Sequence, residues 1–316
     1  MAFAQGSRSR LAFGVESTFG SAASSYTNLP FNSHSLNLSK ERVAGNEIQP
    51  DRMPRVDRHG NRSVAGDIAV DLRDSAYDDL LESAMLSTFS TNVLKVGTTP
   101  KFLTLEDYAA DIDNDSDGAS SRLFTGCTVS TMNVSMAPNQ MVSATFGMVG
   151  KDMTISDAEK TVAAAGVGEP FDAYSGNVLV ADVDGIGGAS ALTAITSVDF
   201  TVTNSFAPTF VVGSDSAPQL EFGRAEIEGT ITAYFEDLSL VNRFLNETES
   251  AIEVSVAEGT TAGDNVMTFL FPRVKFNGAD IPVDGPTSRI VTLPFVALYD
   301  DAVGLETNLK ITTSTV

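Results

Sequence analysis

The chain has 316 residues, a formal net charge of −21 and an apolar fraction of 42%. At about 150 residues per domain, this length predicts two compact domains, each able to bury its own core. No apolar run approaches the ~20 residues that a membrane-spanning helix needs, and the excess of carboxylates disfavours tight binding to nucleic acids or anionic lipid. The single cysteine, Cys127, excludes an internal disulfide.

The N-terminal stretch MAFAQGSRSRLAFG contains arginines but no long apolar segment, so we expect no signal peptide and a protein that is made in a cytoplasm. Beyond it, apolar and polar residues alternate along most of the chain, which predicts β-strands separated by Gly, Asn, Asp and Pro turns. Helical spacing occurs in two places, after Asp74 and after Asp237. We therefore expect a mainly β fold with two short helices.

The segment 43–61 has neither the period of a strand nor that of a helix, and its two prolines remove backbone hydrogen-bond donors. Positive charge is concentrated here in an otherwise acidic chain, on Arg52, Arg55, Arg58 and Arg62. A loop this long is usually functional or disordered. It is therefore either an arm that docks on an acidic neighbour or a solvated excursion without a role.

The second half of the chain repeats a pattern of the first. At a constant offset, the residues Gly60, Gly66, Ile68, Leu72 and Leu81 are matched by Gly223, Gly229, Ile231, Phe235 and Phe244, and residues 142–149 are matched by 291–298 at a shorter offset. Such self-similarity predicts a duplicated unit with a strand followed by a short helix; the alternative is a chance match of two glycine-flanked amphipathic strands. The expected domains are 1–165, with the basic arm loop 43–61, and 166–316, with an apolar arm loop 204–223.

Catalytic and metal-binding patterns are weak. The phosphate-loop, dinucleotide, nucleophile-elbow and zinc-protease motifs are missing, and His34 and His59 lie in polar, turn-like sequence, where surface histidines are expected. Residues 113–118 read DNDSDG, the start of a calcium loop, but Phe124 stands where a bidentate glutamate is required. We expect a non-enzymatic protein without cofactors, in which this loop is flexible and acidic.

Three stretches resemble the major tail tube proteins of long-tailed, non-contractile bacteriophages. They are SRSRLAFGVESTFG near the start, NEIQPDRMPRVDRHGNRSVAGDIAVDL, and GCTVSTMNVSMAPNQMVSATFGMVGKD. The resemblance covers nearly the whole chain, and its most specific part is the GNRSVAGDI stretch.

The resemblance implies a structural virion protein built from tube-type β-sandwich or half-barrel domains, each with one short flanking helix. Such domains join between subunits into a β-barrel, and their rings stack into a hollow tube around the tape measure protein, through which DNA is delivered. The implied further partners are the tail terminator and tail-tip proteins, and DNA that passes without sticking, but no membrane.

Two tube domains in one chain predict a ring of three chains with pseudo-sixfold symmetry. A ring of six chains, each with one tube domain and one decoration domain, is the alternative for the assembly. A non-enzymatic β-sandwich that serves as a binding or adhesion module is the alternative for the function.

Roles for individual residues follow from this interpretation. Arg52, Arg55, Arg58 and Arg62 are candidates for contacts between rings. Asp67 and Asp71 are candidates for the lumen lining, because they alternate with apolar strand residues and would repel DNA. The alternation alone does not decide which strand face points inward.

Overall fold

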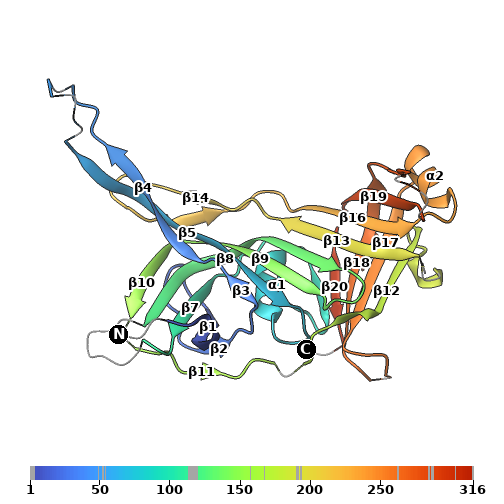
Figure 1. The fold of residues 1–316 in the computed structure, drawn as a ribbon, viewed down its shortest axis with the longest axis horizontal. Coiled ribbons are helices and arrows are strands. Elements are labelled where there is room, and N and C mark those ends of the chain that lie inside the picture. Colours follow the sequence, from blue (N-terminus) through green and yellow to red (C-terminus); the bar gives the residue numbers. More distant parts are fainter. Residues whose placement is uncertain are drawn as a thin grey trace.

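The computed structural model describes residues 4–48, 50–51, 53, 55–112, 120–156, 158–166, 168–189, 192, 194–261, 263–283, 285, 288–302 and 304–314. The protein is mainly β, with two short α-helices, as the alternation of apolar residues predicted. Figure 1 shows an elongated molecule from which one long hairpin projects. Within the described ranges, neither helix has the length and apolar character to cross a membrane.

The first half of the chain contains β-strands, one α-helix and one 3₁₀ turn. Its elements are η1 (Gly6–Arg8), β1 (Ser9–Val15), β2 (Tyr26–Asn28), β3 (Ser33–His34), β4 (Asn37–Ala44), β5 (Asp57–Asp71), α1 (Asp78–Met85), β6 (Val93–Lys95), β7 (Leu103–Ala109), β8 (Ser121–Met136), β9 (Ser143–Gly150), β10 (Asp152–Ser156) and β11 (Val162–Ala163).

The second half has a similar series of elements. They are β12 (Asp172–Asp182), η2 (Ile186–Gly188), β13 (Ile195–Thr203), β14 (Ala207–Thr209), β15 (Gln219–Glu221), β16 (Glu226–Tyr234), α2 (Ser239–Leu245), β17 (Ser250–Ala257), β18 (Val266–Phe276), β19 (Ile290–Ala297) and β20 (Lys310–Thr313).

The two halves have the same strand connectivity. In the first half, antiparallel pairs run in the order β1–β7–β8–β9–β5–β4. In the second half, the order is β12–β17–β18–β19–β16–β13, again antiparallel throughout. A short helix follows β5 and another follows β16. The strand pairings therefore repeat in the same order as the sequence pattern.

The register of the equivalent strands differs slightly between the halves. Ile68 lies opposite Phe146 in the β5–β9 pair, whereas Ile231 lies opposite Leu293 in the β16–β19 pair. The repeat matches Phe146 with Phe295, so the two registers differ by two residues. Side chains alternate with a period of two, so such a shift keeps each residue on its original face of the sheet.

Strand β8 joins the two halves into one sheet. Its residues 121–127 pair with β7 and β10. Its residues 128–135 pair with β9 on one edge, and its residues 131–136 pair with β13 on the other. A register shift between Val129 and Thr131 separates the two parts. One hydrophobic core cluster extends through both halves, and it includes the fully buried Cys127, whose thiol pKa is raised by burial.

The strands extend further into the basic segment 43–61 than its prolines indicated. β4 continues to Ala44 and β5 begins at Asp57, so the loop between them is 45–56. The apolar segment 204–223 is also partly regular, because it contains the small β14–β15 hairpin.

Candidate assembly surfaces

The hairpin of β4 and β5 extends away from the body of the molecule (Figure 1). Its outermost strand pairs are Arg42 opposite His59, Val43 opposite Arg58 and Ala44 opposite Asp57. The described residues between 42 and 59 are exposed on both faces. Because a two-stranded ribbon without a packed face is only marginally stable in water, this outer part, which we call the arm, is suited to being covered by another molecule.

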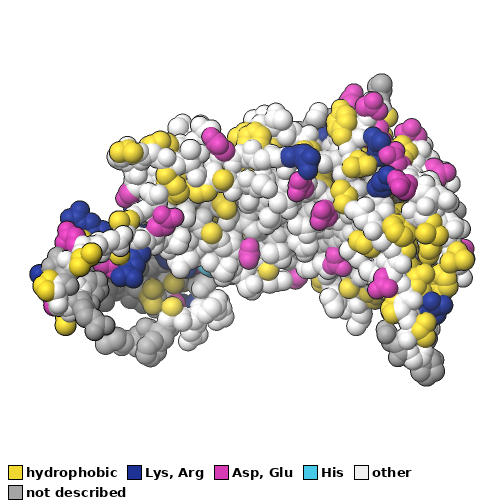
Figure 2. Space-filling model, turned by 90° about the horizontal axis from the view of Figure 1, so that it is seen from above, with side chains coloured by type: hydrophobic (Ala, Val, Ile, Leu, Met, Phe, Trp, Pro, Cys, Tyr) yellow, Lys and Arg dark blue, Asp and Glu magenta, His cyan; other side chains and the backbone are white. Residues whose placement is uncertain are grey.

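The described arginines of the arm are arranged beside carboxylates. Arg42 Nε lies 2.8 Å from Asp57 Oδ2, and Arg55 Nη2 lies 2.7 Å from Asp51 Oδ2. Arg58 is exposed on β5, and Arg52 lies outside the described residues. Figure 2, which views the molecule from above, shows basic side chains beside acidic ones at this end.

The arm also carries exposed apolar side chains, which the pattern of the sequence does not distinguish from core residues. Val43, Ile48, Met53 and Val56 are all exposed, with Ile48 fully accessible. The sequence shows that these residues are apolar, but it does not show that their side chains stay outside the core. The arm thus offers an apolar patch as well as charge, and such patches often mark interaction sites.

Arg62 occupies a different place from the other three arginines. Its backbone N–H donates to Asp215 O (2.8 Å), and its Nη2 lies 3.1 Å from Asp152 Oδ2 and 3.3 Å from Asp215 Oδ1. Asp215 belongs to the connection between β14 and β15. Arg62 therefore joins the second arm to β5 within one chain, a contact between distant segments that their sequences do not indicate.

The second arm, residues 204–223, is fixed at its base. Phe206 and Leu220 pack with Leu86 in a small apolar cluster. The side-chain amide of Asn204 donates to Ala84 O (2.7 Å). At the tip, Val211 and Val212 are exposed. Both arms therefore end in exposed apolar residues.

Asp67 and Asp71 lie on one face of β5, as the alternation predicted. Asp67 is exposed and Asp71 is partly exposed, whereas Ile68 and Val70 are fully buried. Asn32 Nδ2 donates to Asp71 Oδ1 (2.8 Å). The two carboxylates therefore face away from the core.

The same polar face continues across the neighbouring strands. We call this the wall face; it comprises the outward positions of residues 65–71, 131–135, 143–149, 197–203, 226–234 and 290–296. Its carboxylates are Asp67, Asp71, Asp199, Glu226 and Glu228. On the adjacent strand β18, Lys275 lies opposite Val296 on the same face and forms an ion pair with Glu247 (2.7 Å). A shallow hollow on this face is lined by residues of both halves, among them Asn133, Thr201 and Asn277. The face therefore has a negative potential that extends over the junction between the halves.

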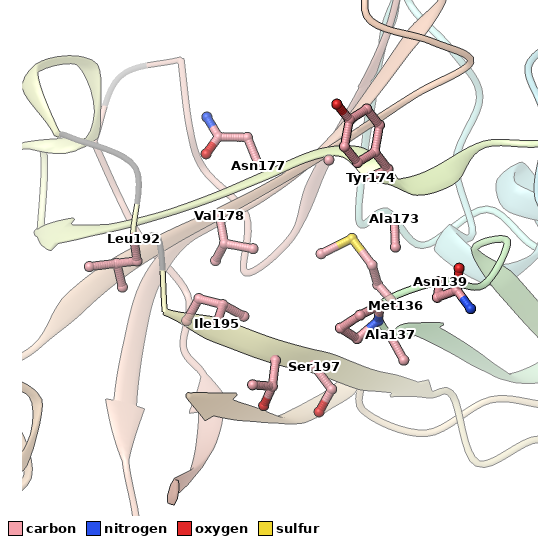
Figure 3. Close-up of a pocket in the computed structure, with 13 residues that line it drawn as sticks. Met136, Ala137, Asn139, Ala173, Tyr174, Asn177, Val178, Leu192, Ile195 and Ser197 are labelled. Atoms are coloured by element: carbon pink, nitrogen blue, oxygen red, sulfur yellow. The ribbon is translucent and has the colours of Figure 1, made fainter. Parts of the chain in front are cut away.

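A second hollow, of about 490 Å³, lies beside the β8–β13 pairing. In Figure 3, Met136, Val178 and Ile195 border it, while Tyr174 and Asn177 lie at its upper edge. The lining residues described carry no carboxylate, ammonium, guanidinium or imidazole group. The hollow thus presents apolar surface and a few amide and hydroxyl groups.

Of the two histidines, only His34 differs from the surface position that we expected. His59 is exposed, but the side chain of His34 is only 12% exposed, and its Nε2 lies 3.5 Å from Asp107 Oδ1. Among the described residues, no three His, Cys, Asp or Glu side chains converge as they would around a metal ion. Residues 113–118 lie outside the described ranges, so the flexible acidic loop there stays a prediction.

Comparison with known protein families matches residues 6–297 to the family described as phage tail tube protein. The chain belongs to this family. The match spans nearly the whole chain, and it confirms the resemblance carried by the three stretches of sequence. A comparison with curated proteins gave no significant match. This tail tube protein is accordingly a structural component of a phage tail.

Proposed function

We propose that this tail tube protein polymerises into rings of three chains, which stack into the hollow tube through which phage DNA is delivered. The repeated connectivity supports this most directly. Each half supplies a series of four paired strands, β4–β5–β9–β8 in the first and β13–β16–β19–β18 in the second. Two equivalent wall segments per chain would let three chains build a ring with pseudo-sixfold symmetry.

Closure of the ring would cover strand edges that are exposed in the isolated chain. The wall strands end at β3–β4 on one side and at the part of β18 past Val274 on the other, and exposed strand edges invite aggregation. Pairing these edges between chains would produce a continuous barrel, which has no free edge. Figure 1 shows β4 and β18 towards opposite ends of the molecule, where neighbouring copies could reach them.

In this assembly the wall face lines the lumen. Its carboxylates, among them Asp67 and Asp71, would repel the phosphates of passing DNA, so that the DNA slides without sticking. The tape measure protein would fill the lumen before ejection. The tail terminator and tail-tip proteins would cover the two ends of the tube, after assembly in the host cytoplasm.

The arm would make the contact between stacked rings. Arg52, Arg55 and Arg58 would meet carboxylates of the adjacent ring, while the exposed apolar residues of the arm pack against it. Arg62 would contribute by holding the second arm in place. Each exposed ion pair is worth only about 0 to 1 kcal/mol, so repetition around the ring must supply the strength.

Electron microscopy of the concentrated protein and of the phage particle tests the proposed function. Stacked hollow rings in both samples are expected. Dispersed monomers in the concentrated sample, together with a particle whose tube lacks this chain, would contradict the proposal.

A further inference from the structure

The junction between the two halves shows how one wall segment joins the next. In the β8–β13 pair, Met132 lies opposite Val202 and Asn133 lies opposite Thr201. Asn204 N donates to Ser130 O (2.8 Å), so even-numbered residues on both strands form the hydrogen-bonded pairs of this antiparallel ladder. Asn133 and Thr201 form a non-hydrogen-bonded pair, and Asn133 Nδ2 donates to Thr201 Oγ1 (3.0 Å).

The counterpart of β8 in the second half is β18. Met132 lies opposite Phe146 of β9, and Phe276 lies opposite Phe295 of β19. Since the repeat matches Phe146 with Phe295, Phe276 corresponds to Met132. The next residues, Asn277 and Asn133, are then also equivalent, and they are the same residue type.

The counterpart of β13 in the first half is the β3–β4 strand. Val202 lies opposite Ile227 of β16, and Leu38 lies opposite Val64 of β5. The repeat matches Ile227 with Val64, so Leu38 corresponds to Val202. Asn37 is therefore equivalent to Thr201.

Both counterparts have an unpaired edge within the part of the chain that the structure describes. β17 pairs with β18 only as far as Val274, and past that residue no described strand pairs on this edge of β18. On the other counterpart, the Leu38 N–H donates to Asn37 Oδ1 (2.9 Å) instead of to a strand. These are the edges that correspond to the two sides of the internal junction.

We propose that neighbouring chains in a ring join by antiparallel pairing of residues 275–278 of one chain with 36–39 of the next, with Asn277 opposite Asn37. This inference rests on the proposed ring and specifies its interchain contact. The partner at each edge is a second copy of this chain. The internal β8–β13 junction is the template for the register.

Two features of these edges agree with this register. Asn277 N donates to Pro294 O (2.8 Å) in β19, so the polar backbone groups of Phe276 point to the free edge, as do those of Leu38. These two residues can therefore form a hydrogen-bonded pair. Leu38 and Phe276 also both pack in or against the core, whereas Asn37 and Asn277 are both exposed.

A shift of the register by one residue would lose both agreements. It would place Asn37 or Asn277 opposite a core-facing residue, because every side chain moves to the other face. It would also place backbone N–H and C=O groups that point towards the neighbouring chain opposite groups that point into their own sheet, so that no hydrogen bond could form between them.

Disulfide trapping tests the register. Asn37 and Asn277 would form a non-hydrogen-bonded pair, in which Cα atoms are about 4.5 Å apart, within the range that a disulfide spans. Tubes assembled from the double variant Asn37→Cys/Asn277→Cys should give, after oxidation, linked species of up to three chains on a non-reducing gel. The natural thiol of Cys127 is fully buried and should not take part.

The controls separate the register from the ring itself. Each single variant should give no linked chains. The double variant Ser39→Cys/Asn277→Cys, offset by two residues, should link poorly, since diagonal positions are about 7–8 Å apart. The register is overturned if intact tubes of the first double variant do not link, or if the offset pair links better. Loss of the ring would instead appear as failure of the unmodified protein to form tubes.

Discussion

The start of α1 places several carboxylates close together. Burial, together with the nearby Asp74, Asp79 and Glu82, raises the pKa of Asp78 to about 6. In the unfolded chain an aspartate has a pKa near 3.9. Between pH 4 and 6 the unfolded state therefore loses its proton while the folded state keeps it, so stability falls as the pH rises through this window.

Substitution Asp78→Asn should remove this penalty. We expect the variant to have a higher Tm than the unmodified protein at pH 7.5, with the difference shrinking towards pH 4, in thermal melts followed by circular dichroism. Asp79→Asn is the matched control, because Asp79 forms an ion pair with Lys101 and its loss should lower the Tm. A Tm difference between Asp78→Asn and the unmodified protein that does not change with pH would contradict the raised pKa of Asp78.

The contacts of Glu16 give a structural reason for part of the stretch SRSRLAFGVESTFG, which resembles tail tube proteins. Its carboxylate accepts hydrogen bonds from Gly20 N (2.7 Å), Gly126 N (2.7 Å) and Thr104 Oγ1 (2.8 Å). Phe19, in the same ESTFG stretch, packs on Phe102 with ring centroids 4.7 Å apart. The motif thus connects the end of β1 to β7 and β8.

Glu16→Ala should destabilise the fold, because a buried donor left without a partner costs about 1–3 kcal/mol. Urea denaturation should show a lower midpoint with an unchanged slope. Glu16→Gln retains an acceptor oxygen and should lose less. Equal midpoints for Glu16→Ala and the unmodified protein would show that these hydrogen bonds contribute nothing measurable.

Among the elements, the repeated glycines Gly66 and Gly229 leave room for different neighbours. Gly66 has a φ of +151°, and a Cβ there would lie 2.6 Å from Leu36 Cα and N. At Gly229 a Cβ would lie 2.4 Å from the Phe295 ring. The sequence predicted that both positions matter, but only the packing shows that Gly66 lets the β3–β4 strand approach β5.

Gly66→Ala should therefore displace the strand that carries the proposed interchain edge. We expect a lower Tm and loss of tube formation, measured by thermal melts and electron microscopy. Gly187→Ala, where a Cβ would meet nothing within 4 Å, is the control and should keep both properties. Normal tubes from Gly66→Ala would show that this strand can move without cost to the assembly.

The arm gives a prediction about stacking. Reversal of Arg52, Arg55 and Arg58 to glutamate should leave the fold intact, since the described positions are exposed, but should stop elongation and leave single rings in electron micrographs. Exchange of Arg42 and Asp57 keeps the net charge and is the matched control. Full-length tubes from the triple variant would show that the arm does not bind the next ring through these charges.

The mainly β fold, the two short helices and the repeat could all be predicted from the sequence. Each depends on local periodicity or on matched residues such as Ile68 and Ile231. The β8–β13 junction and the contact of Arg62 with Asp215 could not be predicted, because they join residues that are distant in the chain. The exposed apolar residues of the arm were missed because composition does not show whether an apolar side chain is buried.

For the whole molecule, the central claim is that one chain supplies two equivalent wall segments. The repeated pairing order and the β8–β13 junction both favour it, since a decoration domain would have no reason to reproduce the connectivity of a wall. The same arrangement makes the internal junction and the proposed interchain junction two copies of one contact. A three-chain ring would thus contain six similar junctions, three within chains and three between them.

Rotational averaging of end-on views of the assembled tubes, with the mass of a single ring, tests this claim most directly. We predict threefold symmetry with a pseudo-sixfold wall and three chains of 33.3 kDa in each ring. True sixfold symmetry with six chains per ring would contradict the claim, because each chain would then supply only one wall segment.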